Sequence, residues 1–358
     1  MKLRIRVESY RRTLATPLAT GRGVLMEREG ILVRLADAEG GVGSGEAAPV
    51  YWIDDDALAA VRDQLNALNG RAVEVEGLDS LDDVGAAVVA LMGTEASRSL
   101  RPAARAAIET AALDLASRRR GVAVATLLGG SADVAIAVNA LVATAEPAAV
   151  GQEVRRHLAN GVRAIKLKVG TCAPGVDVER IRAAATAAAN GGVRLRLDAN
   201  RAWSPSVAES VLAAAPRDAI DYVEEPLAQP TLSGLARLRA ATRVAVAIDE
   251  SLSLLGGVAP LAAATACDVV VLKPARIGGP LPTLVLARDA REHGLRCVLT
   301  DSIETAVGRA AVVHTAAALG GDLEAIGLGG PGLVDDEPIH PCMRPCGPGL
   351  AVRGESCS

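Results

Sequence analysis

The stretch AIKLKVG, residues 164–170, has the pattern of a short core strand, yet it contains two lysines. Successive side chains on a strand point to opposite faces, so Lys166 and Lys168, two positions apart, project from the same face. An ammonium group costs several kcal/mol to bury unless it is paired or hydrated. The stretch therefore belongs in a fold in which one end of a buried sheet meets a charged site.

Composition limits the kind of protein that carries this strand. The chain has 358 residues, a formal net charge of −4 and 50% hydrophobic residues, which suits one large domain of α/β-barrel size or two ordinary domains. The slightly acidic balance argues against nucleic acid or an anionic membrane as the main partner. No apolar run reaches spanning length, and MKLRIRVESYRR lacks the apolar segment of a signal peptide. We expect a cytoplasmic protein that acts on a small molecule; a homo-oligomer is compatible with the sequence.

The second part of the chain repeats a strand and a helix. From about residue 134, short β-branched runs start roughly 25 to 30 residues apart, the length of a strand, a helix and two loops. The eight runs are VAIAVNALVA (134–143), AIKLKV (164–169), VRLRLDAN (193–200), AIDYVEEP (219–226), VAVAIDES (244–251), VVVLKP (269–274), LRCVLTDS (295–302) and LEAIGLGG (323–330). Eight such units predict an α/β protein with a parallel (β/α) barrel.

The first hundred residues follow a different pattern. LRIRVESYRR (3–12), GILVRLADAEG (30–40) and GVGSGEAAPV (41–50) read as antiparallel strands with Gly-rich turns. Helices are expected over about residues 54–68 and 80–91, and an Ala-rich helix over 97–121 that ends in a basic turn and Gly121. Strands followed by helices predict a separate α+β module.

Polar residues gather at the carboxyl ends of the barrel strands, where the chemistry of such barrels takes place. In strand order they are Lys166 and Lys168, Asp198 and Asn200, Glu224 and Glu225, Asp249 and Glu250, Lys273, and Asp301, Ser302 and Glu304. One charged residue at a strand end usually caps a helix. Six consecutive strands with the same feature indicate an active site instead.

Asp198, Glu224 and Asp249 follow three adjacent strands. Three converging carboxylates repel one another and raise one another's pKa values unless a cation lies between them. Ligands that are all oxygen, with open positions, favour Mg²⁺ over Zn²⁺. The alternative is a ring of salt bridges between these carboxylates and the neighbouring lysines.

Lys168 precedes the acidic residues in strand order and Lys273 follows them, so the two lysines are expected on opposite sides of the site. This arrangement suits removal of the weakly acidic α-proton of a carboxylate substrate, provided that the developing negative charge is held by Mg²⁺ and cations in a dry site. Burial and nearby positive charge are expected to lower the pKa of a lysine enough to make it a usable base.

The motifs at these strand ends resemble those of the enolase superfamily, in its muconate-lactonizing subgroup. They are the K-x-K of AIKLKVG, RLDANRAW, VEEPL, AIDESL, VLKPARIGG and TDSIETAVG, in that order along the chain. The resemblance implies a modified TIM barrel of the (β/α)₇β type, with an N-terminal α+β capping domain completed by the C-terminal tail. The expected ranges are 1–120 for the capping domain, 121–332 for the barrel and 333–358 for the returning tail.

The resemblance also assigns roles to residues. Asp198, Glu224 and Asp249 become the Mg²⁺ ligands, with Glu224 preferred over Glu225 because the first glutamate of the E-E-P motif is the ligand in the family. Lys168 and Lys273 become the acid/base pair. Lys166, Asn200, Ser302 and Arg196 are candidate substrate contacts, although an ion pair inside the barrel explains Arg196 equally well.

Within the subgroup, the stretches MEREGILVRL, GEAAPV, DANRAW and SIETAVG resemble o-succinylbenzoate synthases. This resemblance implies a Mg-dependent lyase of menaquinone biosynthesis that dehydrates 2-succinyl-6-hydroxy-2,4-cyclohexadiene-1-carboxylate. The alternatives are dipeptide epimerases and N-acylamino-acid racemases, which use the same lysine pair. Dipeptide epimerases usually carry an Asp-x-Asp motif near the eighth strand, whereas this chain has GDLEAIGLGGPG there, and we take that difference as evidence against an epimerase.

Three further interpretations of the sequence carry less weight. A barrel that only binds a ligand would be expected to have lost a metal ligand or a lysine, and none is missing. Cys342, Cys346 and Cys357 with His340 could form a soft-metal cluster, although ordinary reduced thiols explain them better. Tyr51-Trp52 is expected in a loop that closes over the site; a local hydrophobic staple is the alternative.

Overall fold

The structure is a computed structural model of the chain. It describes residues 1–20, 23–50, 57–93, 100–189, 191–321, 324–328, 343–346 and 349–352. None of the helices within these ranges combines the length and the apolar character needed to cross a bilayer. Tyr51-Trp52 and most of the residues after 328 lie outside the described residues, so the expectations for them stay predictions.

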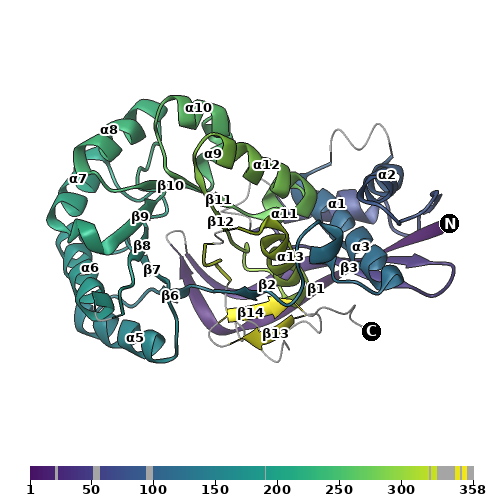
Figure 1. The fold of residues 1–358 in the computed structure, drawn as a ribbon, viewed down its shortest axis with the longest axis horizontal. Coiled ribbons are helices and arrows are strands. Elements are labelled where there is room, and N and C mark those ends of the chain that lie inside the picture. The colour runs from purple at the N-terminus through teal and green to yellow at the C-terminus, as the bar shows by residue number, and fades with distance from the viewer. Residues whose placement is uncertain are drawn as a thin grey trace.

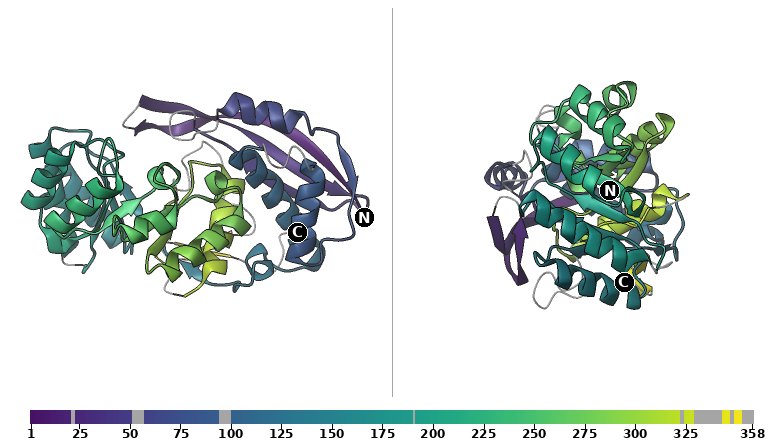
Figure 2. Two further views of the ribbon diagram at one scale, coloured as in Figure 1. Left: turned by 90° about the horizontal axis from the view of Figure 1, so that it is seen from above. Right: turned by 90° about the vertical axis from the view of Figure 1, so that its left-hand side faces the viewer.

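The N-terminal part is an antiparallel sheet with helices packed on it, as the sequence predicts. Its strands, in the order β3-β2-β1-β4, are β1 (Lys2–Thr20), β2 (Gly23–Asp37), β3 (Val42–Ala47) and β4 (Ala72–Glu74). The helices are α1 (Leu58–Asn66), α2 (Leu81–Met92), α3 (Pro102–Arg120) and the short α4 (Val124–Leu127). The β1–β2 hairpin extends along one side of the molecule toward the second sheet (Figure 2).

Close packing of α3 on β3 depends on glycine and alanine. A Cβ atom on Gly45 would lie 1.9 Å from the carbonyl oxygen of Ala107, and one on Gly43 would lie 2.2 Å from that of Ala111. Only glycine allows the strand to approach the helix backbone this closely. At its other end α3 stops at Gly121, which has φ of 64° in the left-handed region that closes many helices.

The second part of the molecule is a curled parallel sheet with helices on its outside (Figure 1). Its strands run in sequence order: β6 (Ala140–Val142), β7 (Ile165–Lys168), β8 (Leu195–Asp198), β9 (Ile220–Glu224), β10 (Val246–Ile248), β11 (Val269–Leu272) and β12 (Arg296–Leu299). The helices are α5 (Pro147–Ala159), α6 (Pro174–Ala189), α7 (Pro205–Ala214), α8 (Leu232–Thr242), α9 (Ser251–Leu254), α10 (Val258–Ala263), α11 (Pro274–Ile277), α12 (Pro280–Glu292) and α13 (Ala306–Leu319). This α/β architecture, with a separate N-terminal domain, confirms the predicted fold class.

The first and last predicted barrel strands differ from the expectation. The run 134–143 divides into β5 (Ala135–Ile136) and β6, and β5 leaves the barrel to pair with β14 (Gly349–Val352), which in turn pairs with β13 (Met343–Cys346). In the run 323–330 the described residues form only isolated bridges, from Ile326 to Val138 and from Gly327 to Thr300. Because Val138 precedes β6 and Thr300 follows β12, this short segment joins the two edges of the sheet.

The tail pairs with β5 through β14. The predicted return of the tail to the N-terminal domain, and the three predicted residue ranges, stay predictions.

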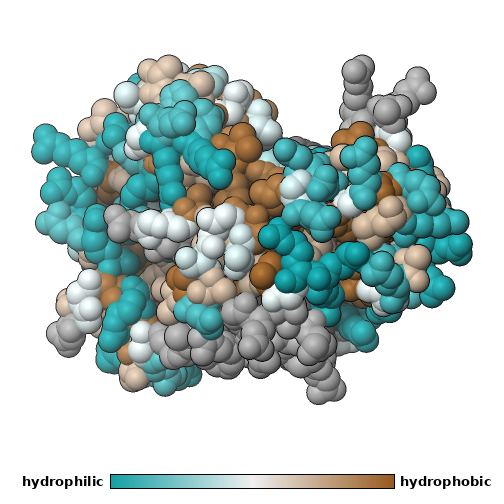
Figure 3. Space-filling model, turned by 45° about the vertical axis from the view of Figure 1, so that its right-hand side comes forward, coloured by the Kyte–Doolittle hydropathy of each residue, from teal (hydrophilic) through white to brown (hydrophobic). Residues whose placement is uncertain are grey.

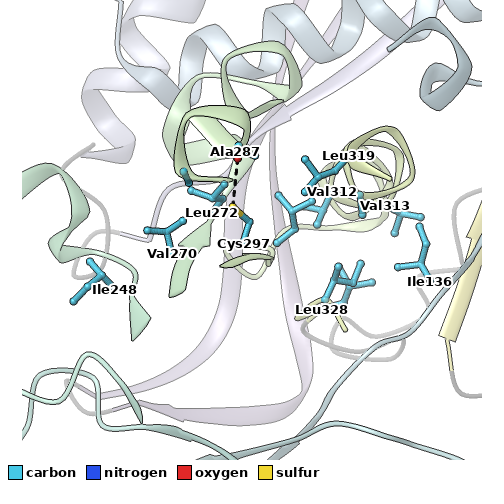
Figure 4. Packing of buried hydrophobic residues seen from close by; sticks show 14 of the residues in the cluster. Ile136, Ile248, Val270, Leu272, Ala287, Cys297, Val312, Val313, Leu319 and Leu328 are labelled. Atoms are coloured by element: carbon cyan, nitrogen blue, oxygen red, sulfur yellow. Dashed lines mark hydrogen bonds between the residues drawn. The ribbon is translucent and has the colours of Figure 1, made fainter. Parts of the chain in front are cut away.

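The core is built from small aliphatic side chains, in a chain that contains no Phe. Figure 4 shows Ile248, Val270 and Leu272 of the sheet in one layer with side chains of α13. The thiol of Cys297 points to α12 and donates to the carbonyl oxygen of Ala287 at 3.6 Å. On the face shown in Figure 3, hydrophilic residues cover much of the surface and apolar residues gather near its centre.

Candidate active site

The predicted site residues lie at the carboxyl ends of neighbouring strands. Lys168 on β7, Asp198 on β8 and Glu224 on β9 are direct partners in the register of the parallel sheet. Asp249 and Lys273 directly follow β10 and β11. In a parallel sheet the carboxyl ends of all strands lie at the same end of the sheet, so five side chains from five strands meet at one rim.

Two lysines from β7 hold the carboxylates of the next two strands. The Nζ atom of Lys166 lies 2.8 Å from Oδ2 of Asp198 and 2.8 Å from both carboxylate oxygens of Glu224. The Nζ atom of Lys168 donates to Oδ2 of Asp198 at 2.7 Å and to Oδ1 of Asn200 at 2.6 Å. The structure therefore brings together both lysines, two predicted metal ligands and Asn200.

A second group forms at β10 and β11. Lys273 Nζ donates to Oδ2 of Asp249 at 2.5 Å, and Nη1 of Arg276 lies 3.4 Å from Oδ1 of the same carboxylate. Arg276 belongs to α11, one helical turn beyond Lys273 in the VLKPARIGG motif. Arg276 was not among the residues predicted from the sequence; its spacing of one helical turn from Lys273 was the signal that could have identified it.

The structure separates the roles of the two glutamates in VEEPL. Glu225 accepts hydrogen bonds from the backbone amides of Asp249 and Ser251, at 2.9 and 2.8 Å, and from the Ser251 hydroxyl at 2.6 Å. Its carboxylate is therefore occupied in holding the turn after β10. Glu224, by contrast, faces the rim, where both of its carboxylate oxygens accept from Lys166; its role as a metal ligand stays a prediction.

Burial and close charges shift the pKa values of these groups. Burial, together with the Asp198 carboxylate, raises the pKa of Glu224 to about 7. For Asp198, burial acts in the same direction, but Lys166 and Lys168 outweigh it and hold the pKa below its usual range. Burial, together with Asp249, raises the pKa of Glu250 to about 8. The rim thus carries more acidic groups than its lysines neutralise fully.

The expectation of lysines with lowered pKa values is wrong for two of them. Burial does act to lower the pKa of Lys273, but the Asp249 carboxylate outweighs it and the pKa lies above its ordinary value. The same holds for Lys166, where Asp198 and Glu224 outweigh burial. The reason is that each ammonium group lies directly against a carboxylate.

The donor set suits a hard divalent cation in its chemistry, because three buried carboxylates lie on consecutive strand ends. In the described part of the chain, however, no three acidic, histidine or cysteine side chains converge closely enough to hold an ion as they are placed. Lys166 lies between Asp198 and Glu224 and takes up their oxygens. A cation on these carboxylates would therefore share them with an ammonium group or displace it.

A cavity of about 360 Å³ opens beside Lys273 and Asp249. Its walls come from both parts of the molecule: Pro49 and Pro102 from the N-terminal domain, and Arg276 and Ser302 from the barrel. Most of the lining is apolar, and the charged groups lie on the barrel side. Ser302 lines this cavity, and its hydroxyl oxygen is buried and makes no hydrogen bond with any residue that the structure describes.

Arg196 lies in the barrel interior, away from this rim. It donates to the carbonyl oxygen of Ala325 at 2.5 Å and to Oε2 of Glu324 at 2.6 Å, and its guanidinium stacks on Tyr222, 5.4 Å from the ring centre. Glu324 also accepts from Arg296. The structure therefore favours the ion-pair interpretation of Arg196 over a substrate contact.

Two further features of the sequence lie largely outside the described residues. Asp322, part of the segment used as evidence against an epimerase, lies outside the described residues, as do Cys342, Cys357 and His340 of the suggested soft-metal cluster. Both interpretations of these cysteines, a soft-metal cluster and ordinary reduced thiols, stay predictions.

Comparison with known families adds two matches that together span most of the chain. Residues 149–352 match the family model described as "Enolase C-terminal domain-like". Residues 2–129 match "Mandelate racemase / muconate lactonizing enzyme, N-terminal domain".

Individual relatives point to related reactions. A hydrophobic dipeptide epimerase of Enterococcus faecalis is 26% identical over 89% of this chain and 88% of its own length. Muconate cycloisomerase 1 of Rhodococcus opacus is 32% identical over 70% of this chain and 69% of its own. A dipeptide epimerase of Cytophaga hutchinsonii, solved with Mg and the dipeptide D-Ala-L-Val, has a similar fold with a TM-score of 0.83, 24% identity, and coverage of 99% of this chain and 94% of the other.

These relatives overturn one prediction from the sequence. Four curated proteins that resemble this chain are named for epimerisation, racemisation or cycloisomerisation. The expectation of an o-succinylbenzoate synthase, and with it the dehydratase activity and the place in menaquinone biosynthesis, is therefore wrong. The error arose because motifs for proton transfer are common to enzymes with different substrates, so these motifs do not identify the substrate.

Proposed function

The chain belongs to the enolase superfamily, and we propose that within it the protein is an epimerase or racemase that inverts the α-carbon of a dipeptide or an N-acylamino acid. One observation carries this proposal. Lys168 at the end of β7 and Lys273 at the end of β11 stand on opposite sides of the acidic strand ends of β8, β9 and β10. Inversion of a carbon atom needs a proton acceptor on one face and a proton donor on the other.

The two lysines divide this work. For one enantiomer Lys168 takes the α-proton and Lys273 returns a proton to the opposite face; for the other enantiomer their roles are exchanged. Either lysine must be neutral to accept a proton, and Asp249 holds the pKa of Lys273 above its ordinary value. Lys273 can therefore accept a proton from a bound substrate only when the Asp249 carboxylate no longer pairs with its ammonium group.

We assign the carboxylates to a Mg²⁺ ion, with Asp198, Glu224 and Asp249 as its ligands. When bound, Mg²⁺ would balance the charge of these carboxylates and stabilise the negative charge that develops on the substrate carboxylate. The solved dipeptide epimerase of Cytophaga hutchinsonii that contains Mg supports this assignment.

Three more side chains complete the proposed site. Lys166 supports the substrate carboxylate and lies beside Lys168, and Asn200 orients the Lys168 ammonium through its hydrogen bond of 2.6 Å. The Ser302 hydroxyl binds a polar oxygen of the substrate, which is supported by its position on the cavity wall and its buried, unpaired state among the described residues. A cytoplasmic location and a homo-oligomeric state stay predictions.

The decisive experiment is a substrate panel in D₂O with MgCl₂. The purified protein is incubated with L,L-dipeptides, N-acylamino acids and cis,cis-muconate, and exchange of the α-proton is followed by NMR while inversion is followed by chiral chromatography. We expect solvent deuterium to enter the α-position together with inversion of a dipeptide or an N-acylamino acid. Turnover of muconate alone, with no α-exchange in the other compounds, would replace epimerisation with cycloisomerisation.

A further inference from the structure

A buried arginine of the N-terminal domain bonds to the loop after β12. Arg28 of β2 is only 3% exposed, although its side chain is charged. Its Nε atom donates to the carbonyl oxygen of Ile303 at 2.7 Å and its Nη2 atom to that of Ser302 at 3.3 Å. Its Nη1 atom donates to the carbonyl oxygens of Glu29 and Pro49, at 3.0 and 3.4 Å.

These acceptors connect two walls of the same cavity. Pro49 lines the cavity from the N-terminal domain, and Ser302 lines it from the barrel. Arg28 bonds to the backbone carbonyls of both residues, so one planar guanidinium group links the two walls directly. A lysine in its place would present one ammonium group and could not match this fork of donors.

The held loop is strained. Ile303 has φ of 65°, in the left-handed region that a β-branched side chain adopts only at a cost of order 1–2 kcal/mol. Such a conformation persists where surrounding contacts impose it, and the hydrogen bond from Arg28 to the Ile303 carbonyl is such a contact. On the other side of the loop, Glu46 of β3 accepts from the amide and the hydroxyl of Thr305, at 3.0 and 2.5 Å.

The strain lies next to a residue that lines the cavity. Ser302 immediately precedes Ile303, and its buried hydroxyl has no hydrogen-bond partner among the described residues. A strained neighbour, a buried arginine and an unsatisfied hydroxyl at one cavity wall are individually costly, and together they suit a group that is held ready for a ligand.

We propose that Arg28 is a positioning residue that acts through Ser302: it fixes the strained loop at Ile303 and the Pro49 wall so that the Ser302 hydroxyl stays aimed at a polar oxygen of the substrate. The substrate-binding role of Ser302 in this proposal rests on the proposed function. The holding of the loop by Arg28 does not depend on it.

The first test needs no substrate. Hydrogen–deuterium exchange is measured on the wild type, Arg28→Met and Arg28→Lys, with Arg12→Met as the matched control. Arg12 lies directly opposite Arg28 on β1, and its side chain is exposed. For Arg28→Met we expect exchange at the amides of residues 302–305 to rise by roughly tenfold or more while residues 102–120 of α3 keep their protection. Unchanged exchange in the loop would overturn the proposal, and so would a rise spread evenly over the molecule.

The second test is a double-mutant cycle on the best substrate of the panel. Ser302→Ala and Arg28→Met should each reduce kcat/KM by roughly 10- to 100-fold, and the double variant should be little worse than Arg28→Met, because both remove the same contact. Arg28→Lys should retain part of the activity. Losses that multiply in the double variant would show that Arg28 does not act through Ser302.

The two tests separate two kinds of failure. If the wild type inverts no substrate, the proposed function fails and the exchange measurement alone decides the role of Arg28. If Arg28→Met does not fold, Arg28→Lys takes its place in both tests: normal loop protection and normal kcat/KM in Arg28→Lys would then overturn the proposal.

Discussion

The Nζ atom of Lys166 lies 2.8 Å from Oδ2 of Asp198, in the space between that carboxylate and the one on the next strand. One ammonium group thus links two residues that we assign as ligands of the same cation. A cation and Lys166 compete for these oxygens, since both need the same lone pairs. The charge balance at this rim is the basis of the first three predictions.

Replacing Lys166 by Met should increase the affinity for Mg²⁺. The substitution removes the competing ammonium group and leaves Asp198 and Glu224 with less compensation in the metal-free protein. We expect the Tm of Lys166→Met to be lower than that of the wild type without metal, and to rise more steeply with added MgCl₂. Lys2→Met, on an exposed residue of the N-terminal sheet, is the control. An equal or weaker response of Lys166→Met to MgCl₂ would show that Lys166 and the cation do not share these oxygens.

Asp249→Asn should lose metal affinity and activity together. The amide removes one negative charge from the assigned ligand set and also leaves Lys273, 2.5 Å from Oδ2, without its carboxylate partner. Titration calorimetry with MgCl₂ and the α-proton exchange assay measure the two effects. Asp218→Asn, on a side chain that is 89% exposed, should change neither. Normal Mg²⁺ binding in Asp249→Asn would remove this residue from the ligand set.

Lys168→Ala and Lys273→Ala should each abolish inversion while the protein stays folded and still binds Mg²⁺. Each variant lacks the proton acceptor on one face of the α-carbon, and loss of such a group costs roughly 10²- to 10⁴-fold in rate. Rates of inversion by chiral chromatography, with circular dichroism and calorimetry on the same samples, measure these effects. Near-normal rates in either variant would rule out the two-lysine mechanism.

Glu109 offers a test of stability away from the active site. It lies on α3, is 1% exposed, accepts from the amide of Leu281 at 2.8 Å, and pairs with Arg105, whose guanidinium also donates to the carbonyl oxygen of Gly278. Burial raises the pKa of Glu109 to about 7 from 4.5. The folded protein therefore binds a proton at Glu109 more tightly than the unfolded chain does.

The sign of the pH dependence follows from this difference. The stability contributed by protonated Glu109 is fully present below about pH 4.5 and is lost as pH rises toward 7, with a total on the order of 3 kcal/mol. Glu109→Gln keeps an acceptor for Leu281 and has no proton to lose. We expect the difference in free energy of unfolding between Glu109→Gln and the wild type to shift in favour of the variant from pH 5 to pH 8. Urea denaturation at several pH values measures it, and Glu179→Gln, on an exposed residue of α6, is the control; a difference independent of pH would contradict the prediction.

Much of the site was predictable from the sequence because it depends on strand ends. AIKLKVG, RLDAN, VEEP, AIDES and VLKP each place a polar residue directly after an apolar run. Once the strands are parallel, these residues must share one edge of the sheet. The structure brings Lys168, Asp198 and Glu224 into direct register for this reason.

Other features depended on contacts that no local pattern reveals. Arg196 shares a strand face with Asp198, yet its side chain turns to Glu324, 128 residues away in sequence. The pKa of Lys273 depends on how close its ammonium group lies to the Asp249 carboxylate, and the sequence does not give that distance. The substrate was misassigned because motifs for proton transfer are common to enzymes with different substrates.

By itself, the sequence determined that Lys168, Lys273 and three carboxylates line one rim of a parallel α/β sheet. Each of these residues ends an apolar strand, and the repeated strand–helix pattern makes the strands parallel. Only the tertiary structure decided that Arg28 reaches the carbonyl of Ser302, 274 residues away, and that Pro49 lines the same cavity as Ser302. The physical reason is that strand periodicity is a property of neighbouring residues, whereas a hydrogen bond between two domains depends on how their surfaces pack.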